Sequence, residues 1–152
     1  MLVKKTGLRF SQTEIDSMVV ADFGLSRPRS EGIQVLTFID TARIGAKIIA
    51  LLPRQTMIEH WHPGRGDDPG KEETLRCLYG TCRVYVPGED TITAGFIPEG
   101  REEYYTCRRE ILLQETEQYT FPPGVPHWFQ PGEEGAVIMS FSTQVTDLED
   151  CF

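Results

Sequence analysis

The three histidines of this 152-residue chain lie in two short segments rich in glycine and proline. His60 and His62 belong to "EHWHPGRGDDPGK", and His127 belongs to "PPGVPHWFQPG". Side chains alternate along a β-strand, so His60 and His62 point to one side while Glu59 and Trp61 point to the other. Two imidazoles placed in this way can reach a single metal ion at ~2.1 Å. The spacing therefore predicts a metal site.

Glu73 and His127 are the residues that can complete such a site. Glu73 begins the next expected strand, after a loop that can fold it back beside the histidines, and His127 follows a rigid Pro-Pro-Gly turn. One carboxylate with imidazoles suits Mn, Fe, Co, Ni or Zn better than Mg or Ca. Because every histidine fits one pattern, we favour this interpretation over separate loop histidines. A structural zinc site is disfavoured, since such sites prefer cysteine ligands.

The overall composition predicts one acidic domain. Lys and Arg number 15 and Asp and Glu number 23, which gives a net charge of −8. This balance argues against a nucleic-acid partner, because phosphate binding needs a basic patch. No apolar run approaches the ~20 residues of a membrane span. The N-terminal "MLVKKTGLRF" lacks the apolar core of a signal peptide, so we expect a cytoplasmic protein.

The chain has four cysteines, Cys77, Cys82, Cys107 and Cys151. Their spacing does not resemble the paired spacing of a cysteine metal site. Cys77 and Cys82 flank a glycine turn and could face each other. In a cytosolic protein, reduced and packed thiols are the expected state.

One short helix is expected near the N-terminus. Ser11 and Glu14 have the spacing of a capping box. Gly24 can end this helix. Its apolar face would comprise Ile15, Met18 and Val19.

After Gly32 the sequence changes to short strands separated by Gly, Pro and Asp. The expected strands are residues 33–40, 46–52, 56–62, 73–80, 82–88, 104–107, 109–114, 118–121, 127–130 and 136–143. Many short strands at such spacing are typical of a sandwich or barrel. We expect residues 1–31 to pack on a barrel formed by residues 32–152, within a single domain. The acidic tail "TDLEDCF" is expected to pack loosely.

Three segments resemble the two cupin motifs, H-x-H…E-x6-G and P-x-G-x-x-H. They are "HWH", "ETLRCLYG" with Glu73 and Gly80, and "PPGVPH". Cupins are double-stranded β-helices, which are small jelly-roll barrels with the metal inside. The resemblance implies an all-β cupin barrel with one short N-terminal helix. It also implies that the metal ligands are His60, His62, Glu73 and His127.

A finer resemblance covers nearly the whole chain. Ten residues separate His62 from Glu73, where most cupins have three or four. This long gap resembles the small D-lyxose isomerase cupins, as do "PGKEETLRCLYG", "PPGVPHWFQPGEEGAV", "ADFGLSR" and "TDLEDCF". That family implies a manganese-dependent aldose–ketose isomerase. It would interconvert D-lyxose and D-xylulose, or D-mannose and D-fructose, through an enediolate.

Moving a carbonyl between C1 and C2 of a sugar requires a metal that polarises it, a base, and donors that fix the open chain. Lys71 precedes the Glu73 strand and is our first candidate for substrate contact or proton transfer; the alternative is a solvated loop lysine. Glu72 has the wrong parity to join Glu73 and is expected to face solvent. The candidates for the pocket wall, which core packing would explain equally well, are Tyr79, Trp128 and Phe129.

Ser140 departs from the pattern of the isomerases that the chain resembles. An inward carboxylate is expected there, in "GAVIMSFSTQ", yet the place holds Met139 and Ser140. Only one of these neighbours can face the barrel interior, and we assign Ser140 there as a substrate-binding candidate together with Phe129. A serine cannot act as a base at neutral pH without an activating partner. Lys71 or a hydroxide on the metal would then take the proton, or the activity is weak, or the substrate has changed.

Two other functions use the same residues. An iron cupin dioxygenase would bind oxygen beside the same ligand set. A non-catalytic sugar-binding or sensor cupin is favoured by the missing carboxylate. Whichever function applies, open sheet edges predict a homodimer formed through edge strands.

Overall fold

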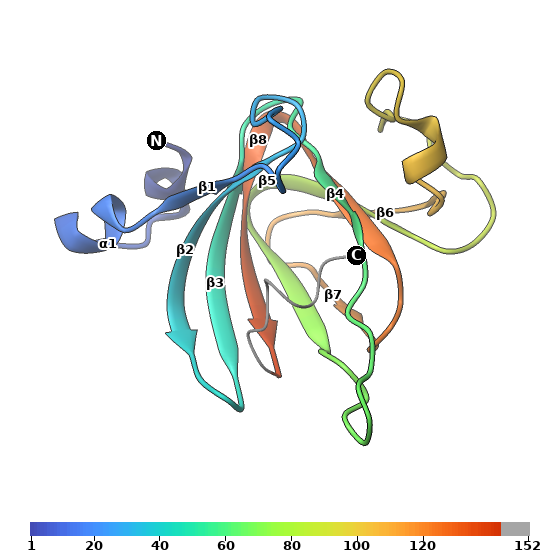
Figure 1. The fold of residues 1–152 in the computed structure, drawn as a ribbon. Coiled ribbons are helices and arrows are strands. Elements are labelled where there is room, and N and C mark those ends of the chain that lie inside the picture. The colour runs from blue at the N-terminus through green and yellow to red at the C-terminus, as the bar shows by residue number, and fades with distance from the viewer. Residues whose placement is uncertain (144–152) are drawn as a thin grey trace.

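The computed structural model describes residues 1–143, and an eight-stranded antiparallel sheet dominates them (Figure 1). Its strands are β1 Val19–Ala21, β2 Ile33–Asp40, β3 Gly45–Leu51, β4 Met57–His60, β5 Glu73–Val86, β6 Arg109–Leu113, β7 Gln118–Phe121 and β8 His127–Ser142. The short helices are η1 Leu2–Thr6, α1 Gln12–Asp16 and η2 Glu102–Tyr104. The expected all-β class with one short N-terminal α-helix is confirmed. The expected tail "TDLEDCF" and Cys151 lie outside the described residues.

Two long strands, β5 and β8, close the sheet into a barrel. The strand order is β1-β2-β3-β8-β5-β6, with β4 also paired to β8 and β7 also paired to β5. The C-terminal half of β8 pairs with β3, and its N-terminal half pairs with β4. The bend lies where β5 shifts register around Gly80. A Cβ at Gly80 would lie 2.3 Å from the Gly135 carbonyl oxygen, so only glycine fits this close crossing.

Two pairs of strands that were predicted as separate are single, bent strands in the structure. Residues 73–80 and 82–88 were expected as two strands, and so were residues 127–130 and 136–143. Each pair instead forms one strand, β5 and β8 respectively. The intervening glycines produce bulges, which turn a strand without ending its hydrogen-bonded ladder. The expected strand 104–107 is also wrong, since η2 and irregular backbone occupy that region.

The N-terminal helix has the predicted start but ends early. Ser11 and Glu14 form the reciprocal capping box. The helix ends at Asp16, however, and Gly24 does not terminate it. Val19 instead belongs to β1, where it lies opposite Val35 of β2. β-Branched residues favour strands when a partner strand is available, and this pairing outweighs the helical pattern.

The apolar core lies inside the barrel. Its fully buried members include Leu51 of β3, Leu75 of β5 and Ile138 of β8. A second cluster on the outside of β3 and β8 is covered by Val3 of η1. In Figure 1 the two N-terminal helices accordingly lie beside the barrel, not within it. The proposed boundary at residue 31 stays a prediction.

Glu31 connects the N-terminal segment to the long excursion between β5 and β6. Its side chain is fully buried. Arg27 Nη1 and Arg101 Nε each lie 3.2 Å from its carboxylate oxygens. The Tyr105 hydroxyl donates a hydrogen bond of 2.8 Å to Glu31 Oε1. This buried carboxylate therefore fixes residues 27–31 against residues 101–105.

Cys77, Cys82 and Cys107 are free and buried, as expected. Burial raises the pKa of Cys77 to about 11 and that of Cys107 to about 12. Thiolates are the reactive form of cysteine, so these three side chains are packed and unreactive.

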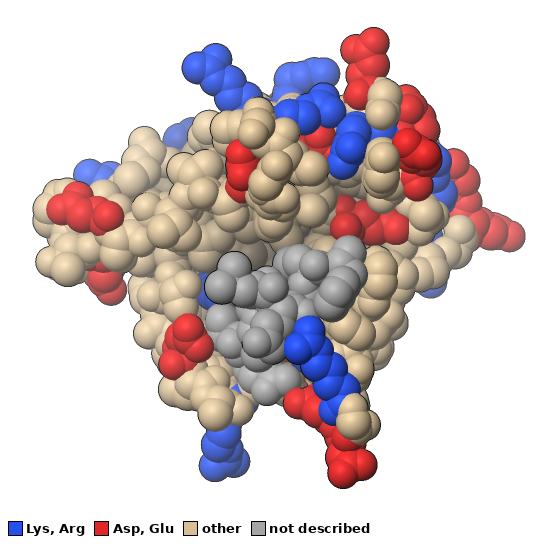
Figure 2. All heavy atoms as spheres, viewed as in Figure 1, with Lys and Arg blue, Asp and Glu red and all other residues tan. Residues whose placement is uncertain are grey.

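On the face in Figure 2, Lys and Arg side chains are interspersed with Asp and Glu. No helix within residues 1–143 has the length and apolar character needed to span a membrane.

Candidate metal centre

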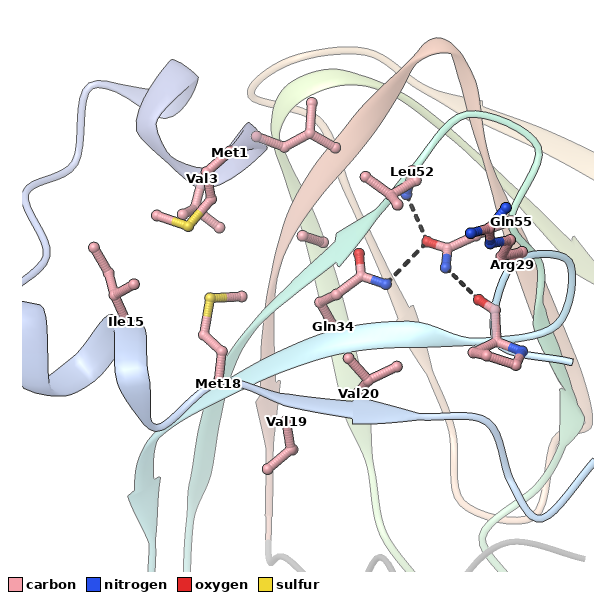
Figure 3. Close-up of a pocket in the computed structure, with 13 residues that line it drawn as sticks. Met1, Val3, Ile15, Met18, Val19, Val20, Arg29, Gln34, Leu52 and Gln55 are labelled. Carbon is pink, nitrogen blue, oxygen red and sulfur yellow. Dashed lines mark hydrogen bonds between the residues drawn. The ribbon is translucent and has the colours of Figure 1, made fainter. Parts of the chain in front are cut away.

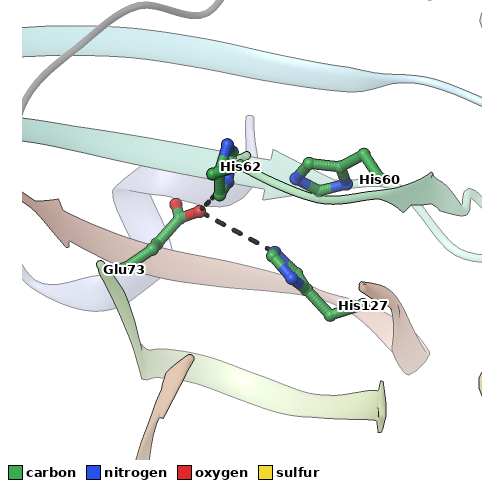
Figure 4. Close-up of side chains that lie close together, drawn as sticks. All are labelled: His60, His62, Glu73 and His127. Carbon is green, nitrogen blue, oxygen red and sulfur yellow. Dashed lines mark hydrogen bonds and ion pairs between the residues drawn. The ribbon is translucent and has the colours of Figure 1, made fainter. Parts of the chain in front are cut away.

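His60, His62, Glu73 and His127 converge inside the barrel (Figure 4). One potential ligand atom from each lies within 4.8 Å of all the others, and all four side chains are buried. His60 ends β4, Glu73 begins β5 and His127 begins β8, so three strand ends bring them together. His62 lies just beyond β4 on the same side as His60, while Trp61 between them is exposed. The predicted alternation along this segment is confirmed.

Backbone carbonyls orient two of the imidazoles. His60 Nδ1 donates to the Ile58 carbonyl at 2.8 Å, and His127 Nδ1 donates to the Val125 carbonyl at 2.9 Å. A proton held on Nδ1 leaves Nε2 as a lone-pair donor directed at the cluster. Such outer hydrogen bonds are the usual support of a metal-binding histidine.

The electrostatics of the cluster keep His60, Glu73 and His127 in the protonation states that a metal requires. Burial lowers the pKa of His127 to about 4 and holds the pKa of His60 well below its usual range. Burial opposes ionisation of Glu73, but the hydrogen bond with His62 and the charge of Lys71 outweigh it. The pKa of Glu73 therefore lies well below its usual range. At neutral pH Glu73 therefore offers a carboxylate, and His60 and His127 offer neutral imidazoles.

The donor set fits a divalent transition metal. His127 Nε2 is buried and has no hydrogen-bond partner. It lies 3.9 Å from Glu73 Oε2, and His62 Nε2 lies 3.1 Å from the same oxygen. Two ligands that share one ion at ~2.1 Å lie at most ~4.2 Å apart, so small side-chain rotations suffice for binding. An ion here would also satisfy the buried nitrogen of His127.

Lys71 lies in the same pocket and is only 5 % exposed. Its Nζ is 3.7 Å from Glu73 Oε2. The alternative of a solvated loop lysine is therefore wrong, because the ammonium is inside the cavity. Glu72, the neighbour of Lys71 in the chain, is exposed as predicted.

Ser140 faces the interior, as predicted, and is 2 % exposed. Its hydroxyl donates a hydrogen bond of 2.5 Å to Glu73 Oε1. Met139 faces the outer cluster together with Val137. Ser140 therefore holds one oxygen of Glu73, while the other oxygen faces His62.

The cluster opens into a cavity of about 570 Å³. Phe129 lines it, in agreement with the sequence prediction. Trp128 does not, because it stacks on Tyr85 with ring centroids 3.6 Å apart in a separate cluster. Tyr79 also points elsewhere, and its hydroxyl contacts Lys5 and Glu134 on the outside. The prediction that Trp128 and Tyr79 line the pocket is therefore wrong.

The cavity also contains residues that the sequence analysis did not single out. Lys47 of β3 and Thr37 of β2 line it, and the segment from Val19 to Gly24 forms part of its wall. Lys47 could have been identified from "AKIIALL", because it alternates in step with Ile49 and Leu51 and so lies on the same face of the strand. Residues 19–24 were not identified as part of the cavity wall, because their sequence has the pattern of a helix.

A second cavity, of about 450 Å³, lies on the outside between η1, α1 and β1 (Figure 3). Its lining is mainly apolar, with Met18, Val20 and Leu52 among its residues. The polar groups of Gln34 and Gln55 within it bond to each other at 3.2 Å. It offers no cluster of chemical groups comparable to the histidine cavity.

No protein-family model matches the chain. Three relatives match it over nearly its whole length. A D-lyxose ketol-isomerase of Cohnella laeviribosi is 45% identical over 152 residues, which cover 99% of this chain and 84% of the relative. A D-lyxose/D-mannose isomerase of Thermosediminibacter oceani is 44% identical, with 99% and 83% covered. A D-lyxose ketol-isomerase of a Thermofilum species is 40% identical, with 99% and 84% covered.

Solved structures share the fold at low sequence identity. An L-ribose isomerase of Cellulomonas parahominis superposes with a TM-score of 0.75 at 13% identity, covering 96% of this chain and 80% of that one. A mutant L-ribose isomerase of Acinetobacter sp. DL28 in complex with L-ribose gives 0.74 at 13% identity, covering 94% and 76%. The architecture is thus the cupin-like barrel found in those enzymes.

Proposed function

The chain belongs to the family of D-lyxose ketol-isomerases, and we propose that its reaction takes place at His60, His62, Glu73 and His127. The protein is an aldose–ketose isomerase that interconverts D-lyxose and D-xylulose, and we extend the substrates to D-mannose and D-fructose. The observation that carries this proposal is the buried cluster of four ligand atoms at the end of a sugar-sized cavity.

The reaction moves one proton from C2 to C1 of the open-chain aldose and another from O2 to O1. A divalent metal at the cluster would supply a Lewis acid that polarises the carbonyl. Lys71 places an ammonium 3.7 Å from Glu73 Oε2. From there it can contact the sugar oxygens, stabilise the negative charge of an enediolate, and exchange a proton with them. Ser140 fixes Glu73, and Phe129 contributes apolar surface to the wall of the cavity.

We propose manganese as the native metal. Three imidazoles and one carboxylate form a mixed nitrogen and oxygen set, which suits Mn, Fe, Co, Ni and Zn. Manganese follows from the resemblance to the lyxose isomerase family, while the donor atoms alone support the wider group. A homodimer and a cytoplasmic location also remain proposals.

A second candidate is a sugar-binding cupin without turnover. The observation that favours it is Ser140, whose hydroxyl occupies the place where a carboxylate base was expected. An iron dioxygenase would use the same four ligands, but the names of the three relatives give it no support.

One experiment separates the three functions. The purified protein is stripped of metal, reloaded with Mn²⁺, and incubated with D-lyxose while ¹³C NMR follows the appearance of D-xylulose. We expect conversion with Mn²⁺ and none in the stripped protein or in a Glu73→Gln variant. Binding of D-lyxose without conversion would favour the sugar-binding cupin. Oxygen uptake by the same protein reloaded with Fe²⁺ in place of Mn²⁺ would favour the dioxygenase.

A further inference from the structure

We infer that Thr37, Lys47 and Ser140 form a polar row across the inner face of the sheet. Within it, Lys47 binds the hydroxyls of the open-chain sugar that lie beyond the reacting carbons. This inference rests on the proposed function, because it extends the same cavity. It assigns a substrate-binding role to a lysine outside the cupin motifs.

The orientation of Lys47 follows from its strand. In β3, Ile49 and Leu51 belong to the inner core cluster, whereas Ile48 and Ala50 belong to the outer one. Lys47 shares the parity of Ile49 and therefore points inward. Its side chain lines the cavity and the residue is only 7 % exposed.

The register places Lys47 between two other polar residues. It lies opposite Thr37 of β2 on one side and opposite Ser140 of β8 on the other. Side chains directly opposite one another on neighbouring strands share a face and have Cβ atoms about 5 Å apart. Thr37 lines the same cavity, and Ser140 bonds to Glu73. The row therefore leads from the ligand cluster along the cavity wall.

A charged residue at this position is costly for the fold. Moving an ammonium away from water is unfavourable unless polar groups compensate for the lost hydration. The inward positions that follow on β3 are apolar. Lys47 therefore places a charge on the wall of the cavity, at the end of an inner face of β3 that is otherwise apolar.

The chemistry of the row matches a linear polyol. The metal and Lys71 would engage the oxygens on the reacting carbons, which leaves the remaining hydroxyls of the sugar to be held. An ammonium donates to several hydroxyl oxygens, and a threonine hydroxyl both donates and accepts. The intervening wall is apolar, with Val35 and Ile49 beside the row, and it can contact the carbon chain.

The test compares Lys47→Met with Lys47→Arg and with Lys4→Met, which changes an exposed lysine. Three quantities are measured on the manganese-loaded proteins: metal content, Tm, and the Kd of a linear pentitol by calorimetry. A pentitol has no carbonyl and cannot be isomerised, so its binding reports on the cavity without turnover. Values of kcat and KM for D-lyxose are measured in parallel.

We expect Lys47→Met to remain folded, as its Tm would show, and to retain full metal. Its pentitol Kd should rise at least ~10-fold, and KM should rise more than kcat falls, since the contact is made in both ground and transition states. Lys47→Arg should recover part of the affinity, and Lys4→Met should match the parent.

Pentitol binding by Lys47→Met within twofold of the parent would overturn the inference, and so would a parent that binds no pentitol. A Tm loss in Lys47→Met that Lys47→Arg fully restores, with unchanged sugar affinity in both, would assign Lys47 a structural role instead. A parent that binds pentitol through Lys47 but converts no aldose would leave this inference standing and reject the proposed function.

Discussion

Three of the four clustered side chains have an outer hydrogen-bond partner, and these partners prepare the site for a metal. Backbone carbonyls hold His60 and His127, and Ser140 holds one oxygen of Glu73. The ligands therefore lose little conformational freedom when an ion binds, which is the main benefit of a rigid outer layer. Glu73 is central, because its second oxygen lies near two histidines and Lys71.

Replacing Glu73 by Gln is expected to remove most of the metal. The change deletes the only anionic group of the cluster and should weaken binding by more than the about 10–100-fold that is typical of an outer-layer partner. His127→Ala should act in the same direction. Glu72→Gln, an exposed neighbour, is the matched control and should keep full metal. Elemental analysis after gel filtration measures the outcome, and full metal in both Glu73→Gln and His127→Ala would refute the ligand assignment.

Lys71→Met should separate metal binding from turnover. The lysine is near the cluster but carries no lone pair for the metal in its charged form, so metal content should stay at the parent level. Loss of its ammonium should lower kcat/KM for D-lyxose by at least ~10-fold, the lower end for a proton-transfer group. Lys4→Met serves as the surface control. Unchanged kinetics in Lys71→Met would remove Lys71 from the mechanism.

Ser140→Ala should weaken the metal site without unfolding the barrel. The variant removes the hydrogen bond to Glu73 Oε1 and leaves that oxygen without its outer partner. The expected loss of metal affinity is about 10–100-fold, measured by competition with a chromophoric chelator. Thr74→Val is the control, since the Thr74 hydroxyl bonds instead to Thr120, 2.8 Å away. Equal affinities in the two variants would contradict a supporting role for Ser140.

At the scale of elements, the sequence predicted what depends on local pattern. Strand β2 coincides with the expected residues 33–40, and the four residues that the cupin motifs indicated do lie together. The sequence did not predict features that depend on distant partners. The segment around Val19 has a helical pattern and becomes a strand only because β2 lies beside it. The inward position of Lys47 likewise depends on β3 forming part of the barrel wall.

The excursion between β5 and β6 depends on the buried carboxylate of Glu31. Tyr105→Phe removes a hydrogen bond to this carboxylate, and both residues are nearly inaccessible to solvent. Hydrogen bonds to charged groups contribute about 1.5–3 kcal/mol. The free energy of unfolding in urea should fall by that amount. Tyr104→Phe, an exposed neighbour, should leave it unchanged. Equal stability of the two variants would show that the Glu31 contact contributes nothing.

At the scale of the whole molecule, the main strand path of the sheet ends at β1 and β6, and these two edge strands differ in character. β1 exposes Val19 and Val20, which are 59 % and 63 % accessible. The apolar cavity beside it adds exposed Met1 and Leu52 (Figure 3). β6 begins with the exposed Arg109. Exposed apolar edges favour pairing with another chain, whereas charged ones discourage it.

We therefore expect the predicted homodimer to form through β1. The chain carries a net charge of −8, so two copies repel unless they meet through an apolar surface, and the β1 edge with its adjoining cavity provides one. Val20→Lys places a charge in the centre of that surface and should give a monomer of 17.2 kDa in sedimentation equilibrium, where the parent gives twice that mass.

Leu112→Lys on β6 is the matched control at the other edge, 46 % exposed in the parent, and should remain dimeric. A monomeric parent would refute the dimer, and a dimer lost only in Leu112→Lys would move the interface to β6. Because Val20 also lines the metal cavity, metal content of the Val20→Lys monomer should be measured alongside, and its retention would show that the barrel holds the ion without a partner.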